Sequence, residues 1–266
     1  MKKTMLFWAA ALSLAVLLTG CGTPEIEEPS ATNKPSSVIT ETAEATKAAT
    51  EATPEETEEE FVYEGDASSY YIDVAYAEQI ARYQTALSEK WNEEKYIANG
   101  MSEVLVAYYE GNPLDNVGFG FVDLDNDGRW ELVIGAIEDA EEYPAVFEIW
   151  TLVDERPVML AQASAKSQYA LQYVEEDNAW YVANENSYSA FCNGTYYLML
   201  NEGKLEVMQG ILYNSEADAQ NPWFMTYDMD WDISTGDPID EETASAILES
   251  HRNHYTALEY FPYIFY

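Results

Sequence analysis

The feature that decides the predicted fold is the stretch from Val117 to Gly135, which reads VGFGFVDLDNDGRWELVIG. Two apolar runs, 117–122 and 130–136, flank a short acidic segment that contains one glycine. Apolar runs of about six residues bounded by turn residues are typical of strands. We therefore predict that the two runs form strands and that the acidic segment connects them.

The acidic segment has the residue spacing of a metal-binding loop. Aspartates occupy its first, third and fifth places, and a glycine at the sixth lets the backbone turn so that the carboxylates converge. A carbonyl oxygen can bind a cation from the seventh place, and a glutamate can bind from the ninth, directly or through water. We predict a Ca²⁺ site with a mainly structural role, and its ligands are Asp123, Asp125, Asp127, Arg129 (through its carbonyl oxygen) and Glu131. The alternative is an acidic turn that binds no metal.

The loop resembles the D-x-D-x-D-G calcium loops of EF-hands, of dockerins and of the β-hairpin loops in integrin-type and bacterial surface repeats. Its first six residues, Asp123 to Gly128, fit that pattern. Ile134 stands at the twelfth place, where an EF-hand has a bidentate glutamate, and the flanks have strand patterns. The resemblance is therefore to the hairpin version, and it implies weak binding with a dissociation constant of about 10⁻⁴ to 10⁻³ M.

Around this segment, the chain predicts an α+β domain over 67–266, in which N-terminal helices and a C-terminal helix pack on an antiparallel β-meander. Apolar residues recur at helical spacing from Ile72 to Trp91, and helices are also expected over 101–110 and 240–259. Asn193-Gly194 predicts a two-residue hairpin turn. The expected strands are 117–122, 130–136, 145–153, 158–163, 169–175, 179–184, 187–192, 195–200 and 204–212.

The first residues indicate export. Lys2 and Lys3 precede a short apolar core, and the segment ends in Leu18-Thr19-Gly20-Cys21. A basic start, a short apolar core and a small-residue cleavage site are typical of a secretory signal peptide. The tetrapeptide resembles a bacterial lipobox, which implies cleavage after residue 20, lipidation of Cys21 and an outward-facing anchor in the cell membrane, since two acyl chains hold a protein there stably. Residues 21–66 are rich in Thr, Glu, Pro and Ala, which predicts a disordered acidic tether.

Charge and cysteine content narrow the function further. The chain has 49 acidic and 12 basic residues, for a net charge of −37. Such a charge repels nucleic acid, which is therefore excluded as a partner, and it favours the binding of cations. Cys192 lies in an apolar run and is expected to be buried and inert. His251 and His254 are expected to be a solvent-exposed pair, because no cysteine or carboxylate joins them at zinc-site spacing.

These observations predict a surface-anchored, non-enzymatic module that binds an envelope or extracellular carbohydrate, peptide or protein. The alternative is an extracellular hydrolase or accessory subunit that uses dispersed carboxylates. Aromatic side chains are abundant, and most should belong to strands and the core. The aromatic residues considered for ligand binding are Trp180, Tyr181, Tyr188, Trp223 and Trp231.

Overall fold

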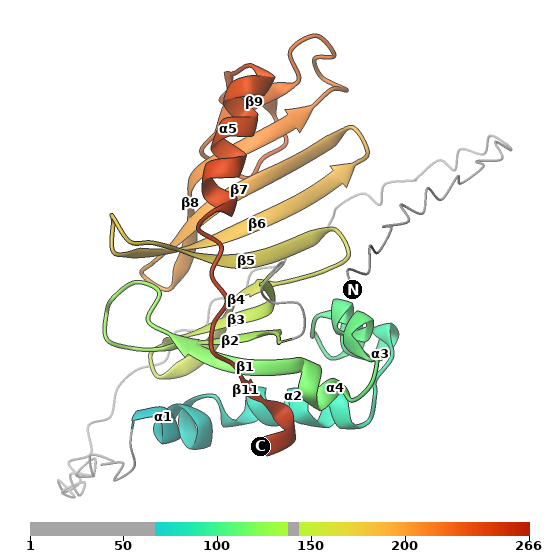
Figure 1. The fold of residues 1–266 in the computed structure, drawn as a ribbon, viewed down its shortest axis with the longest axis vertical. Helices are drawn as coiled ribbons and strands as arrows, with labels where there is room; N and C mark the ends of the chain where they lie inside the picture. The colour runs from blue at the N-terminus through green and yellow to red at the C-terminus, as the bar shows by residue number, and fades with distance from the viewer. Residues whose placement is uncertain (1–66, 138–143) are drawn as a thin grey trace, which may run out of the picture. The chain divides into compact units, whose positions relative to one another are not determined.

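In the computed structural model, which describes residues 67–137 and 144–266, eleven strands form one antiparallel sheet that a few helices accompany (Figure 1). The predicted fold class, a β-rich α+β fold, is thereby confirmed. The described residues all belong to one unit of the chain, Glu60–Tyr266. The predicted signal peptide, residues 1–20, and the predicted tether, residues 21–66, lie outside the described residues.

Most strands that are neighbours in the sheet are also neighbours in the chain. The order is β10-β9-β8-β7-β6-β5-β3-β2-β1-β11, and β4 pairs with β3 beside this path. The strands are β1 (Val117–Val122), β2 (Glu131–Ala136), β3 (Ala145–Val153), β4 (Arg156–Gln162), β5 (Ser167–Val174), β6 (Ala179–Ser189), β7 (Cys192–Asn201), β8 (Lys204–Asn214), β9 (Trp223–Thr226), β10 (Asp237–Pro238) and β11 (Phe261–Pro262).

The predicted strands agree with these bounds except between β6 and β7. The predicted strand over 179–184 and the first half of the one over 187–192 form the single strand β6, and the sequence does not predict β9, β10 and β11. The predicted turn at Asn193-Gly194 is wrong: both residues lie within β7, opposite Ser187 and Asn186, and the chain turns after Ser189. Gly194 has another role, because a Cβ there would lie 2.5 Å from the Tyr196 hydroxyl oxygen.

The helices are shorter than the apolar periodicity predicts. The expected helix from 72 to 91 is a π-helical turn over Tyr71–Ala75 followed by α2, and the one over 101–110 is a 3₁₀ helix over Glu103–Tyr108. The last helix begins as expected, since Asp240 caps it by accepting a 2.8 Å hydrogen bond from the Thr243 N–H, but it ends at residue 252. The α-helices are α1 (Ala67–Tyr70), α2 (Ala77–Ser88), α3 (Glu93–Ala98), α4 (Pro113–Asn116) and α5 (Glu241–Arg252).

The core has two main parts, on either side of the first strands. Ile80 and Leu87 of α2, together with Tyr76 just before the helix, are fully buried in the cluster that also contains Leu132 and Ile134 of β2. A second cluster follows the other face of the sheet from β1 to β8. Helix α5 lies against the sheet farther along, beside β7 to β9 (Figure 1).

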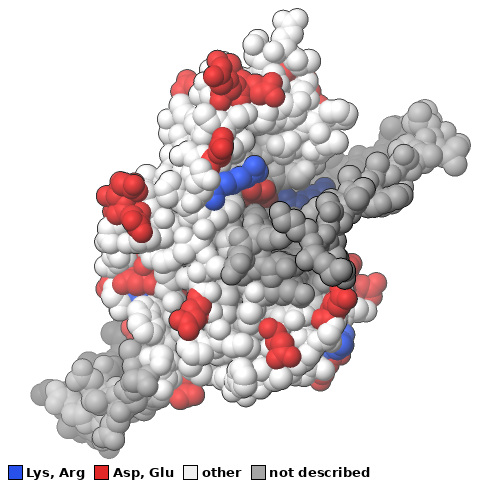
Figure 2. Space-filling view, in the orientation of Figure 1, with Lys and Arg blue, Asp and Glu red and all other residues white. Residues whose placement is uncertain are grey.

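Acidic side chains are spread over the face that Figure 2 shows, and basic ones are sparse there, as the net charge of −37 leads one to expect. Within the described part of the chain, no helix is both long enough and apolar enough to cross a membrane.

Candidate metal centre

The acidic segment joins β1 to β2 as a tightly closed loop. The carboxylate of Asp123 accepts hydrogen bonds of 3.0 Å from the N–H groups of both Asp127 and Gly128. Asn126 and Gly128 have positive φ values of 58° and 87°, a region that glycine and asparagine enter most readily. The loop therefore coils back on its first aspartate, as the sequence predicts.

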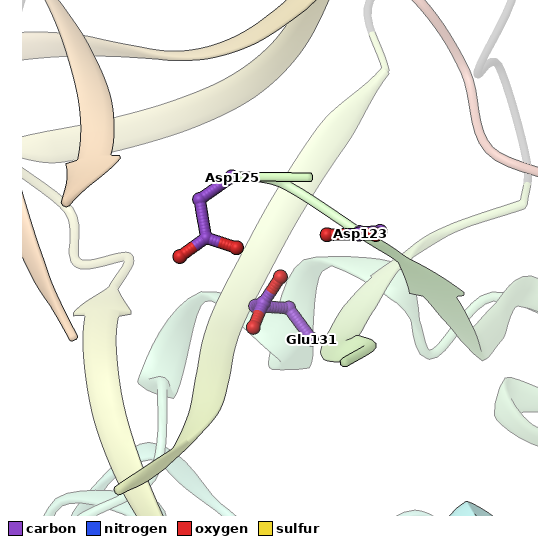
Figure 3. Close-up of side chains that lie close together, drawn as sticks. All are labelled: Asp123, Asp125 and Glu131. Carbon is purple, nitrogen blue, oxygen red and sulfur yellow. The ribbon is translucent and has the colours of Figure 1, made fainter. Parts of the chain in front are cut away.

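Three carboxylates converge at this loop. Oxygen atoms of Asp123, Asp125 and Glu131 lie within 4.8 Å of one another, and Figure 3 shows the side chains of the two aspartates and of Glu131 gathered in one region. Two of the groups come from the loop and the third from the first residue of β2. Three of the five predicted ligands are thus brought together.

Glu131 is the buried member of this group, with 2% of its surface exposed. One carboxylate oxygen accepts a 2.8 Å hydrogen bond from the Leu124 N–H, and the other accepts one of 2.9 Å from the Thr151 hydroxyl. Burial raises the pKa of Glu131 to about 7, and the charges of Asp125 and Asp127 act in the same direction. Burial also raises the pKa of Asp125, with further contributions from its acidic neighbours.

The remaining two predicted ligands have other contacts. The carboxylate of Asp127 is exposed and accepts a 2.7 Å hydrogen bond from the Arg129 N–H. The Arg129 side chain forms a 3.3 Å ion pair with Glu155. Coordination by the Asp127 carboxylate and by the Arg129 carbonyl oxygen stays a prediction.

Residues outside the loop that no sequence motif indicates form hydrogen bonds with its C-terminal end. Thr151 comes from β3 and reaches Glu131 across the sheet. The Tyr71 hydroxyl accepts a 3.1 Å hydrogen bond from the Trp130 N–H, and the Tyr76 hydroxyl donates one of 2.9 Å to the Trp130 carbonyl oxygen. The only sequence signal for these residues is that their strand or helix is amphipathic, which does not single them out.

This arrangement can hold a metal ion, and its chemistry favours a hard cation. All the converging ligands are oxygens, and two oxygens that each lie about 2.4 Å from one Ca²⁺ ion are at most about 4.8 Å apart, so the observed convergence is compatible with one such ion. Bringing three carboxylates together raises their mutual repulsion, which a divalent cation would relieve.

The predicted aromatic residues do not form one surface. Tyr188 and Trp231 lie together, with ring centroids 5.7 Å apart, and 63% of the Tyr188 surface is exposed. Trp180 instead packs against Tyr173 at 5.0 Å. Trp223 meets a different tyrosine, Tyr213, at 4.8 Å.

Tyr181 is half-buried on β6, where burial raises its pKa and a hydrogen bond to Asp177 adds to the shift. The aromatic residues considered for ligand binding are therefore distributed over several parts of the sheet. Three aspartates, Asp228, Asp230 and Asp232, follow β9 in a segment without strand structure.

The prediction of an exposed histidine pair is wrong for His251. Its ring stacks on Tyr197 with centroids 3.3 Å apart and planes 10° from parallel, and its Nε2 lies 2.9 Å from Gln209 Oε1. Burial lowers the pKa of His251 to about 4. The predicted burial of Cys192 is confirmed, since 2% of its surface is exposed, and burial raises its pKa; that the thiol is inert stays a prediction.

The chain matches no protein-family model, and no curated protein or solved structure is similar enough to count as a match.

Proposed function

We propose that this chain is a bacterial lipoprotein whose folded part binds Ca²⁺ in the loop between β1 and β2 and acts as a non-enzymatic binding module. In this proposal Cys21 carries the lipid that anchors the protein, facing outward, at the cell membrane. The Ca²⁺ ion is structural, and the ligand of the module is a carbohydrate, peptide or protein of the envelope or its surroundings.

The observation that carries the calcium assignment is the convergence of Asp123, Asp125 and Glu131, one of which is buried; among the described residues, none of the three forms an ion pair. A buried carboxylate is normally paired or neutralised, since desolvation disfavours the charged form strongly. A divalent cation would supply the missing positive charge. Its site ties the loop to β2, which supports a role in stability.

The test is the stability of the full chain during a Ca²⁺ titration after chelation. With a dissociation constant of about 10⁻⁴ to 10⁻³ M, about 10 mM Ca²⁺ adds about 1.4 to 2.7 kcal/mol. For a domain of this size that raises the melting temperature by about 3 to 10 °C. Calorimetry should find one site per chain, and the Asp125→Asn variant should lose both responses.

The matched control is Asp232→Asn. Like Asp125, Asp232 accepts a hydrogen bond from a backbone N–H two residues ahead, in this case one of 2.9 Å from Ser234, but Asp232 is exposed and lies outside the converging group. This variant should keep the full Ca²⁺ response. If the unsubstituted chain neither gains stability nor binds Ca²⁺ by calorimetry, the calcium assignment fails.

The anchor has a separate test. Expression of the full chain in a bacterial host with labelled fatty acid should label the protein, and Cys21→Ser should abolish the label and release the protein from the membrane fraction. Equal labelling of both forms would contradict the role of Cys21.

A further inference from the structure

A polar hollow of about 450 Å³ lies on the sheet beside α5, outside the calcium loop. Its floor crosses four strands. The residues Gln168, Glu185, Thr195 and Ile211 stand directly opposite one another in register on β5, β6, β7 and β8, so their side chains share one face. A parallel row brings Ser187, Asn193, Tyr213 and Trp223 to the same face.

The floor offers hydrogen-bonding groups that the protein itself does not use. Among the described residues, no hydrogen bond engages the side chains of Gln168, Asn193 or Thr195. An amide side chain both donates and accepts, and so does a hydroxyl. The hollow therefore presents both donors and acceptors to a ligand, side by side.

The walls of the hollow add an aromatic surface and positive charge. Trp223 lines one side, and its ring is supported by Tyr213 with centroids 4.8 Å apart. Lys166 and Arg252 also line the hollow, although residues 67–266 contain only eight basic side chains. Arg252 is 3.5 Å from the Glu185 carboxylate, whereas no ion pair within the described ranges involves Lys166.

These features favour a saccharide over a peptide. A peptide that adds to a sheet needs free backbone groups, but β6 and β7 are paired on both sides where they form the floor. Recognition must therefore come from side chains. A sugar presents hydroxyls that donate and accept and an apolar ring face that packs on an aromatic plane.

We infer that this hollow is the ligand site of the binding module and that it takes a short acidic saccharide, whose ring packs on Trp223 and whose carboxylate meets Lys166. A hollow of about 450 Å³ is within the range of small-molecule sites. The inference rests on the proposed function as a binding module, and it names the ligand class and the site for that function.

The experiment is a binding titration of the full chain in Ca²⁺ buffer. The probes are short oligosaccharides that carry glucuronate, N-acetylmuramate or sialate, each paired with its neutral methyl ester, and binding is followed by tryptophan fluorescence and saturation-transfer NMR. We expect saturable binding of at least one acidic probe with a dissociation constant below about 10 mM, and weaker binding of its ester.

Variants then locate the site. Trp223→Ala should weaken binding about tenfold, since the loss of an aromatic contact of about 1.4 kcal/mol has that effect. Lys166→Gln should weaken binding of the acidic probe about threefold and leave its ester unchanged. Tyr227→Ala and Lys204→Gln, which change an exposed aromatic and an exposed lysine outside this hollow, are the matched controls and should bind normally.

If Trp223→Ala fails to fold, Asn193→Ala replaces it, because Asn193 is exposed and its side chain makes no hydrogen bond to the described protein. No saturable binding across the panel, equal binding of acids and esters, or full binding by the Trp223→Ala or Asn193→Ala variant would overturn the inference. The Ca²⁺ shift of melting temperature is measured on the same samples. If that shift persists while saccharides fail to bind, only the saccharide inference is refuted, and the calcium assignment is retained.

Discussion

Replacing Glu131 by glutamine should stabilise the protein without metal and remove its response to Ca²⁺. Burial raises the pKa of Glu131 from 4.5 to about 7. At a pH between these two values, the Glu131 carboxyl is therefore protonated in the folded state and ionised in the unfolded state. Stability consequently falls as the pH rises through this window, and it stays low above it.

The size of this loss of stability follows from the difference between the two pKa values of Glu131. A difference of about 2.5 pKa units corresponds to about 3 kcal/mol near pH 8. Glutamine removes this penalty but loses one of the two hydrogen bonds that Glu131 accepts from Leu124 and Thr151, a loss of about 1 kcal/mol. In chelator, Glu131→Gln should thus be more stable than the unsubstituted chain by about 2 kcal/mol.

Added Ca²⁺ should remove this difference in stability between Glu131→Gln and the unsubstituted chain. About 10 mM Ca²⁺ adds about 1.4 to 2.7 kcal/mol to the unsubstituted chain, and the variant lacks a charged ligand and gains little. The assay is urea unfolding followed by tryptophan fluorescence near pH 8, with chelator and with Ca²⁺. A difference in stability between the two chains that is the same in both buffers would refute the reasoning.

Glu148→Gln is the control for a buried glutamate on the same sheet. Glu148 lies on β3 with 0% of its surface exposed, and burial raises its pKa as well. It does not belong to the converging carboxylates. Its substitution should therefore change stability by the same amount with and without Ca²⁺.

Three further predictions test the fold by urea unfolding. Gly194→Ala should cost about 1 to 3 kcal/mol, because the new Cβ would lie 2.5 Å from the Tyr196 hydroxyl oxygen; unchanged stability would contradict this packing. Asp240→Ala should cost about 1 kcal/mol by removing the cap of α5, and Asp240→Asn, which keeps an acceptor, should cost less. Because burial lowers the pKa of His251 from 6.5 to about 4, the unfolded state binds the proton first, and stability should fall as the pH falls through that range. Relative to His251→Gln, the unsubstituted chain should lose about 2 kcal/mol between pH 7 and pH 4.5, and a constant difference would exclude a buried neutral imidazole.

The elements that the sequence predicts well depend on local chemistry. The loop between β1 and β2 follows from its aspartates and from Gly128, whose φ of 87° is a property of that residue and its neighbours. The start of α5 is likewise local, because Asp240 reaches an N–H three residues ahead. Neither feature needs a partner from a distant part of the chain.

The elements that the sequence misses depend on distant partners. Asn193-Gly194 has the composition of a turn, yet these two residues pair with β6 on one side and β8 on the other. The Tyr196 ring approaches Gly194 and also Gly210 of β8, where a Cβ on either glycine would lie 2.6 Å from a ring carbon. His251 stands in a polar stretch, but its partners Tyr197 and Gln209 come from β7 and β8. Such contacts arise only after the strands have paired, so periodicity and composition do not reveal them.

The comparison of the two buried glutamates explains why only one of them is assigned to a metal. Three hydrogen bonds of 2.9 to 3.1 Å reach Glu148, from the Ser102 N–H, the Trp150 indole and the Gln162 amide. From the described residues Glu131 accepts two, and Asp125 and Asp127 are its acidic neighbours. A carboxylate has about four acceptor positions, so Glu148 is largely satisfied by the protein and Glu131 is not. The unsatisfied acceptor capacity lies at the loop where Asp123 and Asp125 also converge, and a cation there would complete all three groups at once.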